Sequence, residues 1–205
     1  MIKAIIFDYG NVISTFNNEI CLDRISATTG KDKEQVREII YGQSQIQKKF
    51  ETGLLTSKEF YRELSTACGL NVSIKKLIDI YSKDKYTLIP GIEKLIKQLK
   101  LKYKIGLLSN TCEWDYIYVV KTAPFVKTFD TITTSFEVKA MKPDPKIYQD
   151  ALTKLKLKPE ECIYIDDIPS YVEAAKNLGL NALQFTTVEK LKSDLFPHHF
   201  SRNYR

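Results

Sequence analysis

The sequence predicts an α/β fold in which a parallel sheet is covered by helices on both faces. Two observations predict it. From residue 89 onward, short apolar runs with strand character alternate with amphipathic helical patterns, as in parallel-sheet proteins. In addition, several of these runs are followed directly by polar side chains, at the strand ends where open parallel sheets bind ligands.

The first strand is expected at residues 4–7, and a long block without a strand pattern follows at 15–88. Asp32 with Gln35, and Thr56 with Glu59, each resemble a capping box that opens a helix. Gly69 fits the end of the second of these helices. We therefore expect an all-helical insertion after the first strand.

The strand and helix alternation begins after the turn at Pro90-Gly91. A helix with an apolar face should start at residue 92. Further strands are expected at 105–108, 131–134, 162–165 and 182–185, with helices at 113–121, 145–157 and 169–178.

Polar residues follow three of the predicted strands, and a lysine precedes one of them. The set comprises Asp8, Ser109-Asn110, Lys142 and Asp166-Asp167. Taken singly, each has an ordinary structural explanation: a turn after a strand, a helix N-cap, a surface lysine or a helix start before Pro169. Taken together at strand ends, the carboxylates, donors and single ammonium suit a divalent cation beside an anion.

The composition argues against several classes of protein. Net charge is +6 over 205 residues, but the lysines are interspersed with acids, which favours solvated helix faces over a nucleic-acid groove. No apolar run approaches the roughly 20 residues that cross a membrane, and we expect no secretory signal. The four cysteines are far apart and form no C-x-x-C pair, so we expect reduced thiols and a cytoplasmic protein.

Four segments together resemble the motifs of the haloacid dehalogenase (HAD) superfamily of hydrolases. IIFDYGNVI resembles its first motif, LLSNT its second, the lysine of MKPDPKIY its third and IYIDDIPS its fourth. All four occur in order, and the likeness spans nearly the whole chain. The resemblance implies a Rossmann-like core over residues 1–14 and 89–205 and a helical cap domain over residues 15–88.

The resemblance also implies a reaction, the hydrolysis of a small phosphorylated metabolite through an aspartyl-phosphate. Asp8 would be the nucleophile. A Mg²⁺ cofactor would be bound by Asp8, the backbone carbonyl of Gly10, Asp167 and, directly or through water, Asp166. The cation would reduce the repulsion between the carboxylate and the phosphate.

The remaining motif residues would bind the phosphoryl group. Lys142 would balance the charge of the nucleophile and of the phosphoryl oxygens, while Ser109 and the backbone of Asn110 would donate hydrogen bonds. The form of the first motif and the segment FETGLLTSKEFYREL resemble the sugar-phosphate phosphatases of the superfamily. We expect a small phosphorylated metabolite as substrate, neither nucleic acid nor membrane as partner, and a monomer or homodimer.

Gly10 departs from the pattern of most phosphatases of the superfamily, which carry a second aspartate at that position. That aspartate protonates the leaving oxygen, a contribution typically worth about 10²- to 10⁴-fold in rate. Three interpretations stay open: a cap side chain or water donates the proton, the substrate has a good leaving group, or the chain is a weak or non-phosphatase member.

Two alternative functions follow from the same residues. A 2-haloacid dehalogenase would use Asp8 without metal and without the second aspartate, but Asp166-Asp167 counts against it, because neighbouring carboxylates are costly unless a cation lies between them. A non-catalytic binding protein on the same fold is the second alternative. Ile168 and Tyr171 also depart from the fourth motif, in which a small polar residue and an asparagine are usual.

Overall fold

The computed structural model describes residues 1–196. Its centre is a parallel sheet of five strands in the order β5-β4-β1-β6-β7. The strands are β1 (Ala4–Phe7), β4 (Lys104–Ser109), β5 (Thr131–Thr134), β6 (Cys162–Asp166) and β7 (Asn181–Gln184). The predicted parallel α/β core is confirmed. Because β1 lies between β4 and β6, the carboxyl end of β1 is the switch point of the sheet, where such folds form a ligand crevice.

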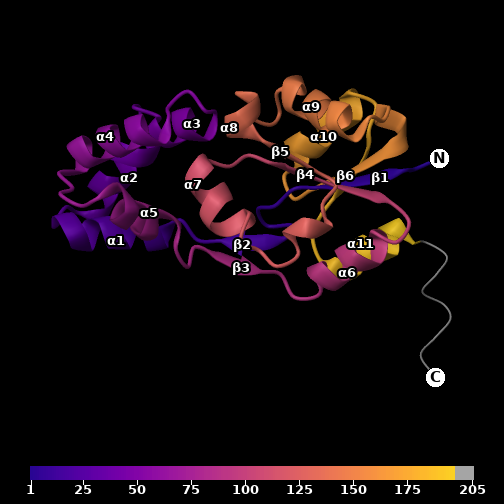
Figure 1. The fold of residues 1–205 in the computed structure, drawn as a ribbon, viewed down its shortest axis with the longest axis horizontal. Helices are drawn as coiled ribbons and strands as arrows, with labels where there is room; N and C mark the ends of the chain where they lie inside the picture. Colours follow the sequence, from indigo (N-terminus) through magenta and orange to yellow (C-terminus); the bar gives the residue numbers. More distant parts are fainter. Residues whose placement is uncertain (197–205) are drawn as a thin grey trace.

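Helices cover both faces of this sheet, as Figure 1 shows. Ile5 and Phe7 point to a cluster shared with α6 (Ile92–Leu99) and α11 (Val188–Leu195). Ala4 and Ile6 point to the opposite cluster, shared with α9 (Pro145–Leu155) and α10 (Pro169–Asn177). Successive side chains of a strand face opposite sides, so a strand covered on both faces is apolar throughout.

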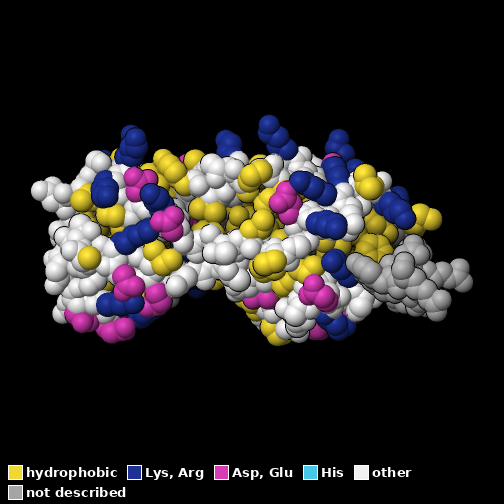
Figure 2. Space-filling view, turned by 90° about the horizontal axis from the view of Figure 1, so that it is seen from below, with side chains coloured by type: hydrophobic (Ala, Val, Ile, Leu, Met, Phe, Trp, Pro, Cys, Tyr) yellow, Lys and Arg dark blue, Asp and Glu magenta, His cyan; other side chains and the backbone are white. Residues whose placement is uncertain are grey.

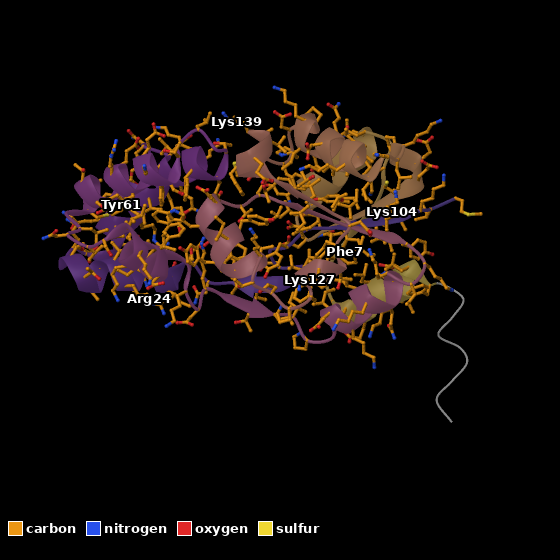
Figure 3. The ribbon with its side chains drawn as sticks, viewed as in Figure 1. Phe7, Arg24, Tyr61, Lys104, Lys127 and Lys139 are labelled. Carbon is orange, nitrogen blue, oxygen red and sulfur yellow. The ribbon has the colours of Figure 1, made fainter. Side chains whose placement is uncertain are left out.

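A separate helical unit extends from the carboxyl end of the sheet (Figure 1). It comprises α1 (Glu19–Thr29), α2 (Lys33–Tyr41), α3 (Ile46–Glu51), α4 (Ser57–Cys68) and α5 (Ile74–Ser82). Both predicted capping boxes are present, and Gly69 ends α4 in the left-handed conformation. The unit has its own apolar interior. Figure 3 places Tyr61 in this unit and Phe7 in the sheet, in different halves of the molecule.

The expectation of helices alone in the block 15–88 is wrong at both of its ends. β2 (Ser14–Phe16) pairs antiparallel with β3 (Tyr86–Leu88), with Ser14 opposite Leu88. Each strand has three residues, too few to show an alternating pattern, and each finds its partner only across the whole helical unit. This two-stranded ribbon carries the chain from the sheet to the helical unit and back.

The predicted helix at 113–121 is α-helical only in α7 (Glu113–Asp115) and continues as a π-helical turn, η1 (Tyr116–Val120). Its N-cap is Cys112 rather than Ser109 or Asn110. The Trp114 side chain points away from the sheet domain and packs edge-on against aromatic rings of the helical unit, including Phe60 at 4.9 Å between ring centroids. The α7 segment therefore joins the two parts of the molecule.

The surface carries no single basic patch on the face drawn in Figure 2, where Lys and Arg side chains are scattered among Asp and Glu. This distribution agrees with the interspersed charges of the sequence. Among residues 1–196, no helix combines the length and the apolar character that a membrane crossing requires.

Candidate active site

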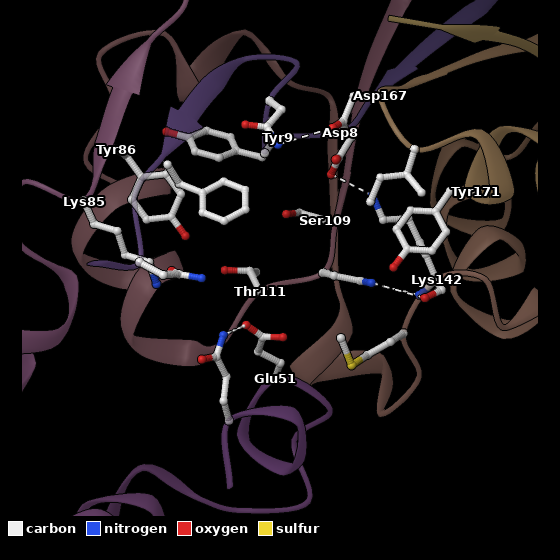
Figure 4. A pocket seen from close by; sticks show the side chains of 18 residues that line it. Asp8, Tyr9, Glu51, Lys85, Tyr86, Ser109, Thr111, Lys142, Asp167 and Tyr171 are labelled. Carbon is white, nitrogen blue, oxygen red and sulfur yellow. Dashed lines mark hydrogen bonds and ion pairs between the residues drawn. The ribbon is translucent and has the colours of Figure 1, made fainter. Parts of the chain in front are cut away.

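A cavity of about 260 Å³ lies at the carboxyl ends of β1, β4 and β6, beneath α3 and beside the ribbon (Figure 4). Residues from the sheet, the helical unit and the ribbon share its wall. They are Asp8, Tyr9, Gly10, Asn11, Phe16, Asn18, Gln47, Glu51, Lys85, Tyr86, Ser109, Asn110, Thr111, Met141, Lys142, Asp167, Ile168 and Tyr171. All but one of the site residues expected from the sequence line this cavity; the exception, Asp166, lies behind its wall, adjoining Asp8 and Asp167.

Asp8 follows β1 directly, and its amide continues the strand pattern by donating to the Ile165 carbonyl at 2.9 Å. Its carboxylate is 2.8 Å from the ammonium of Lys142, which lies 2.7 Å from Asp166 on the other side. All three side chains are buried. A lysine shared between two buried carboxylates fixes the position of both, because neither charge has water to replace its partner.

Burial, with a smaller contribution from the nearby charge of Asp166, raises the pKa of Asp8 to about 7 against the lowering effect of Lys142. Burial acts to lower the pKa of Lys142, but Asp8 and Asp166 together hold it above its ordinary value. The lysine therefore stays charged, while the ionisation of Asp8 depends on how much positive charge surrounds it.

The backbone of Lys142 is held by Asn110. The side-chain oxygen of Asn110 accepts from the Lys142 amide at 2.8 Å, and its amide nitrogen donates to the Lys142 carbonyl at 3.3 Å. The lysine loop is thus tied to the residue that follows β4. The motif resemblance predicts that the backbone of Asn110 binds the phosphoryl group. The structure adds a second role, because the Asn110 side chain holds the backbone of Lys142 in place.

Three carboxylates converge at the end of the sheet. Asp8, Asp166 and Asp167 each place an oxygen atom within 4.8 Å of the others. Asp166 also accepts hydrogen bonds from Tyr164 and from the Ile168 amide. With one lysine nearby, the three carboxylates carry excess negative charge once all are ionised, and their hard oxygen atoms are the ligands that Mg²⁺ prefers. The residues present therefore fit a divalent cation.

Ser109 is the last residue of β4, and Figure 4 shows its hydroxyl pointing into the pocket. Tyr171 covers Lys142 from α10, with the ammonium 5.1 Å from the centre of its ring, a cation–π distance. Asn11 donates to Asp167 at 3.2 Å. At the two positions where the sequence departs from the fourth motif, Tyr171 therefore places an aromatic ring over Lys142, and Ile168 forms an apolar part of the pocket wall.

Gly10 has space for a side chain only if Phe16 moves. A Cβ atom at this position would lie 3.2 Å from Cε1 of the Phe16 ring, which belongs to β2. The backbone of Gly10 is not in the left-handed region, so its conformation does not demand glycine. The ring of Phe16 therefore lies beside the position from which an acid/base side chain would extend.

Sequence reasoning missed the pocket residues that come from the helical unit and the ribbon. The carboxyl of Glu51 lines the pocket and accepts from the Gln47 side chain at 2.6 Å, and burial raises its pKa to about 7. Asn18 also lines the pocket. No local pattern marks these residues, because the face that α3 turns to the pocket depends on packing. Phe50, the residue before Glu51 on α3, is instead buried in the interior of the helical unit.

A second buried ion pair lies where the ribbon meets α7. The ammonium of Lys85 is 2.8 Å from Asp115, and both side chains are nearly inaccessible. Ser82 and Tyr86 donate to the same carboxylate at 2.7 and 3.0 Å. This network ties the segment between α5 and β3 to the core and places one wall of the pocket.

Comparison with known proteins identifies proteins that are similar to this chain in sequence. The model of the haloacid dehalogenase-like hydrolase family matches residues 19–185, a span that begins after Asp8. A D-ribitol-5-phosphate phosphatase from Bacteroides thetaiotaomicron is 27% identical over 208 residues, covering 90% of this chain and 92% of that protein. Acyl-CoA dehydrogenase family member 10 of Mus musculus is 25% identical over 96% of this chain, which spans 20% of the mouse protein.

A solved structure shows the same fold. The crystal structure of a HAD family enzyme from Bacteroides thetaiotaomicron, in complex with magnesium and inorganic phosphate, superposes with a TM-score of 0.81. The two sequences are 27% identical, and the match covers 96% of this chain and 100% of that one.

Proposed function

We propose that this chain, which belongs to the haloacid dehalogenase-like hydrolase family and is a phosphatase of that family, hydrolyses small phosphate monoesters, sugar phosphates among them. The reaction would use Mg²⁺ and would pass through a phosphorylated Asp8. The substrate type is suggested by the names of its relatives, a D-ribitol-5-phosphate phosphatase and a phosphorylated carbohydrates phosphatase. The magnesium and phosphate in the related crystal structure support the cofactor and the product.

One observation carries the proposal: the oxygen atoms of Asp8, Asp166 and Asp167 lie within 4.8 Å of one another while Lys142 bridges two of them. Asp8, the Gly10 carbonyl, Asp166 and Asp167 would hold the Mg²⁺. When bound, the cation supplies positive charge where a carboxylate must approach a phosphate dianion.

The residues of the chain then have distinct roles. A carboxylate oxygen of Asp8 attacks phosphorus, the bond to the leaving oxygen breaks, and an acyl phosphate forms on Asp8. Lys142 and the hydroxyl of Ser109 stabilise the charge on the phosphoryl oxygens. Asn110 keeps Lys142 in place through its side-chain amide. Attack of water on the acyl phosphate releases inorganic phosphate and regenerates Asp8.

The proton for the leaving oxygen does not come from position 10, where glycine stands and the Phe16 ring is adjacent. Without that general acid, the rate should depend strongly on how readily the leaving group departs. Esters of acidic alcohols such as p-nitrophenol should react faster than alkyl esters, by up to about 10²- to 10⁴-fold.

The helical unit (α1–α5) supplies the wall of the pocket that faces the sheet, and we infer that residues 15–88 act as a cap over a core of residues 1–14 and 89–205. We also propose a cytoplasmic location, with which the buried free cysteines agree, and a monomer or homodimer. Neither nucleic acid nor membrane is proposed as a partner.

The test is phosphate release from a panel of phosphate monoesters, with Mg²⁺ and with a chelator. We expect metal-dependent release that Asp8→Asn abolishes and Asp167→Asn reduces, with thermal melting showing that both variants fold. Halide release from 2-chloropropionate without metal would instead identify a dehalogenase. Silence in both assays would favour a binding protein.

A further inference from the structure

We propose that Glu51, Gln47 and Asn18 bind hydroxyl groups on the alcohol portion of the substrate, so that the enzyme selects phosphate monoesters of neutral, polyhydroxylated alcohols. This inference rests on the proposed phosphatase function. It assigns substrate selection to three side chains that no motif identifies.

Glu51 and Gln47 occupy the end of the pocket away from the phosphoryl site, and Asn18 lines the same pocket. Figure 4 shows Asp8 and Glu51 on opposite sides of the pocket, with Ser109 and Thr111 between them. A phosphoryl group in contact with Asp8 and Ser109 directs its leaving oxygen away from Asp8, because attacking and leaving oxygens are roughly in line. The alcohol portion of the ester therefore extends toward Glu51.

The pocket wall contains hydrogen-bond acceptors to which no described residue donates. The side-chain oxygens of Gln47 and Asn18 are buried, and neither has a hydrogen-bond partner within residues 1–196. The amide nitrogen of Gln47 donates to Glu51 at 2.6 Å, which leaves further acceptor capacity on that carboxyl. Buried acceptors of this kind normally have partners, and hydroxyl groups of a ligand would supply them.

The charges at this end favour neutral donors over an ammonium group. Lys85 lines the same pocket, and Asp115, 2.8 Å from its ammonium, balances its charge, so this pair offers no net negative charge to an ammonium group. Burial also raises the pKa of Glu51 to about 7, so its carboxyl is only partly charged near neutral pH. Hydroxyl groups can donate to the amide oxygens and can either donate to or accept from the Glu51 carboxyl.

The position of Glu51 is set by contacts with the core. Its backbone carbonyl accepts from the Ser135 hydroxyl at 2.6 Å, and that hydroxyl also accepts from the Thr111 amide at 2.9 Å. Two residues later, the chain passes so close to the Phe136 carbonyl that a Cβ on Gly53 would lie 2.1 Å from its oxygen. The end of α3 is thus held against the sheet, and a binding group held in advance loses little entropy on binding.

The test compares esters that differ only in hydroxyl groups or charge. D-ribitol 5-phosphate is paired with pentyl phosphate, and 2-hydroxyethyl phosphate with 2-aminoethyl phosphate. We expect Glu51→Ala to lower kcat/KM for ribitol 5-phosphate about 10-fold or more, chiefly through KM, and to change kcat/KM for pentyl phosphate less than about 2-fold. Gln47→Ala should act in the same direction, and the wild type should prefer the hydroxyethyl to the aminoethyl ester.

Exposed Glu63 on α4 provides a matched control, since Glu63→Gln should change none of these values. Equal losses on ribitol 5-phosphate and pentyl phosphate, unchanged kinetics, or a preference for the aminoethyl ester would each overturn the inference. Calorimetric titration of Asp8→Asn with ribitol 5-phosphate separates binding from turnover. Weaker binding after adding Glu51→Ala supports the inference even if no ester is hydrolysed, and equal binding refutes it.

Discussion

Replacing Lys142 with methionine should destabilise the protein strongly, and more at alkaline than at acid pH. The substitution keeps an unbranched side chain of similar length but removes the ammonium between Asp8 and Asp166. That ammonium lies 2.8 and 2.7 Å from the two carboxylates, and the Lys142 residue is 4% exposed. Water cannot readily take its place.

The magnitude follows from the burial. Removing one partner of a buried ion pair costs about 3–5 kcal/mol, because the remaining charge is left without compensation. Since Lys142 serves two carboxylates, the loss should lie at the upper end, about 4–5 kcal/mol. For a chain of this length, a loss of 1 kcal/mol lowers Tm by about 2–4 °C, so Tm should fall by roughly 8–20 °C.

The sign of the pH dependence follows from Asp8. Burial raises its pKa to about 7 while Lys142 opposes the rise, so the pKa should increase further in Lys142→Met. A carboxyl whose pKa is raised on folding stabilises the protein less as pH rises through that range. At pH 5 Asp8 is largely protonated in both folded proteins. At pH 8 Asp8 is largely ionised in the folded wild type, whereas in the folded variant it should still be protonated. The difference in stability should therefore be larger at pH 8.

Urea unfolding followed by circular dichroism, at pH 5 and pH 8 without Mg²⁺, measures both effects. Lys146→Met, at an exposed position on α9, is the matched control and should stay within about 0.5 kcal/mol of the wild type. A Lys142→Met protein as stable as the wild type at pH 8, or a loss equal at both pH values, would refute the reasoning.

Three further predictions concern the pocket and its surroundings. Gly10→Asp alone should not accelerate hydrolysis of alkyl phosphates, because its Cβ would lie 3.2 Å from the Phe16 ring; adding Phe16→Ala should raise kcat, by up to about 10²-fold, and a gain from the single variant would contradict this. Lys85→Met should lower the free energy of unfolding, measured in urea, by about 3–5 kcal/mol, because it leaves Asp115 buried and unpaired. Adding Asp115→Asn should recover part of this loss, and strictly additive effects of the two substitutions would exclude the coupling. Because burial raises the pKa of Glu51 from 4.5 to about 7, the wild type should lose stability between those pH values; Glu51→Gln should match it at pH 4 and melt higher at pH 8, and identical pH profiles would rule out the raised pKa.

The sequence by itself determined the parallel sheet and the residues at its carboxyl edge. Strands such as β1 are short apolar runs, and the polar residue that follows each run is visible in the chain itself. Once the strands are parallel, their carboxyl ends must meet at one edge, so the sequence alone is enough to place Asp8, Ser109 and Asp167 together. The capping boxes of α2 and α4 were equally readable, because each depends on residues three apart.

Only the tertiary structure decided what faces that edge. Glu51 reaches the pocket because α3 packs on α4 and Trp114, and no pattern within the α3 sequence specifies which of its faces points to the sheet. Phe16 lies beside Gly10 because β2 pairs with β3, a strand distant in the chain. Local sequence encodes the period and ends of an element, whereas the direction in which a side chain finally points depends on contacts between elements far apart in sequence.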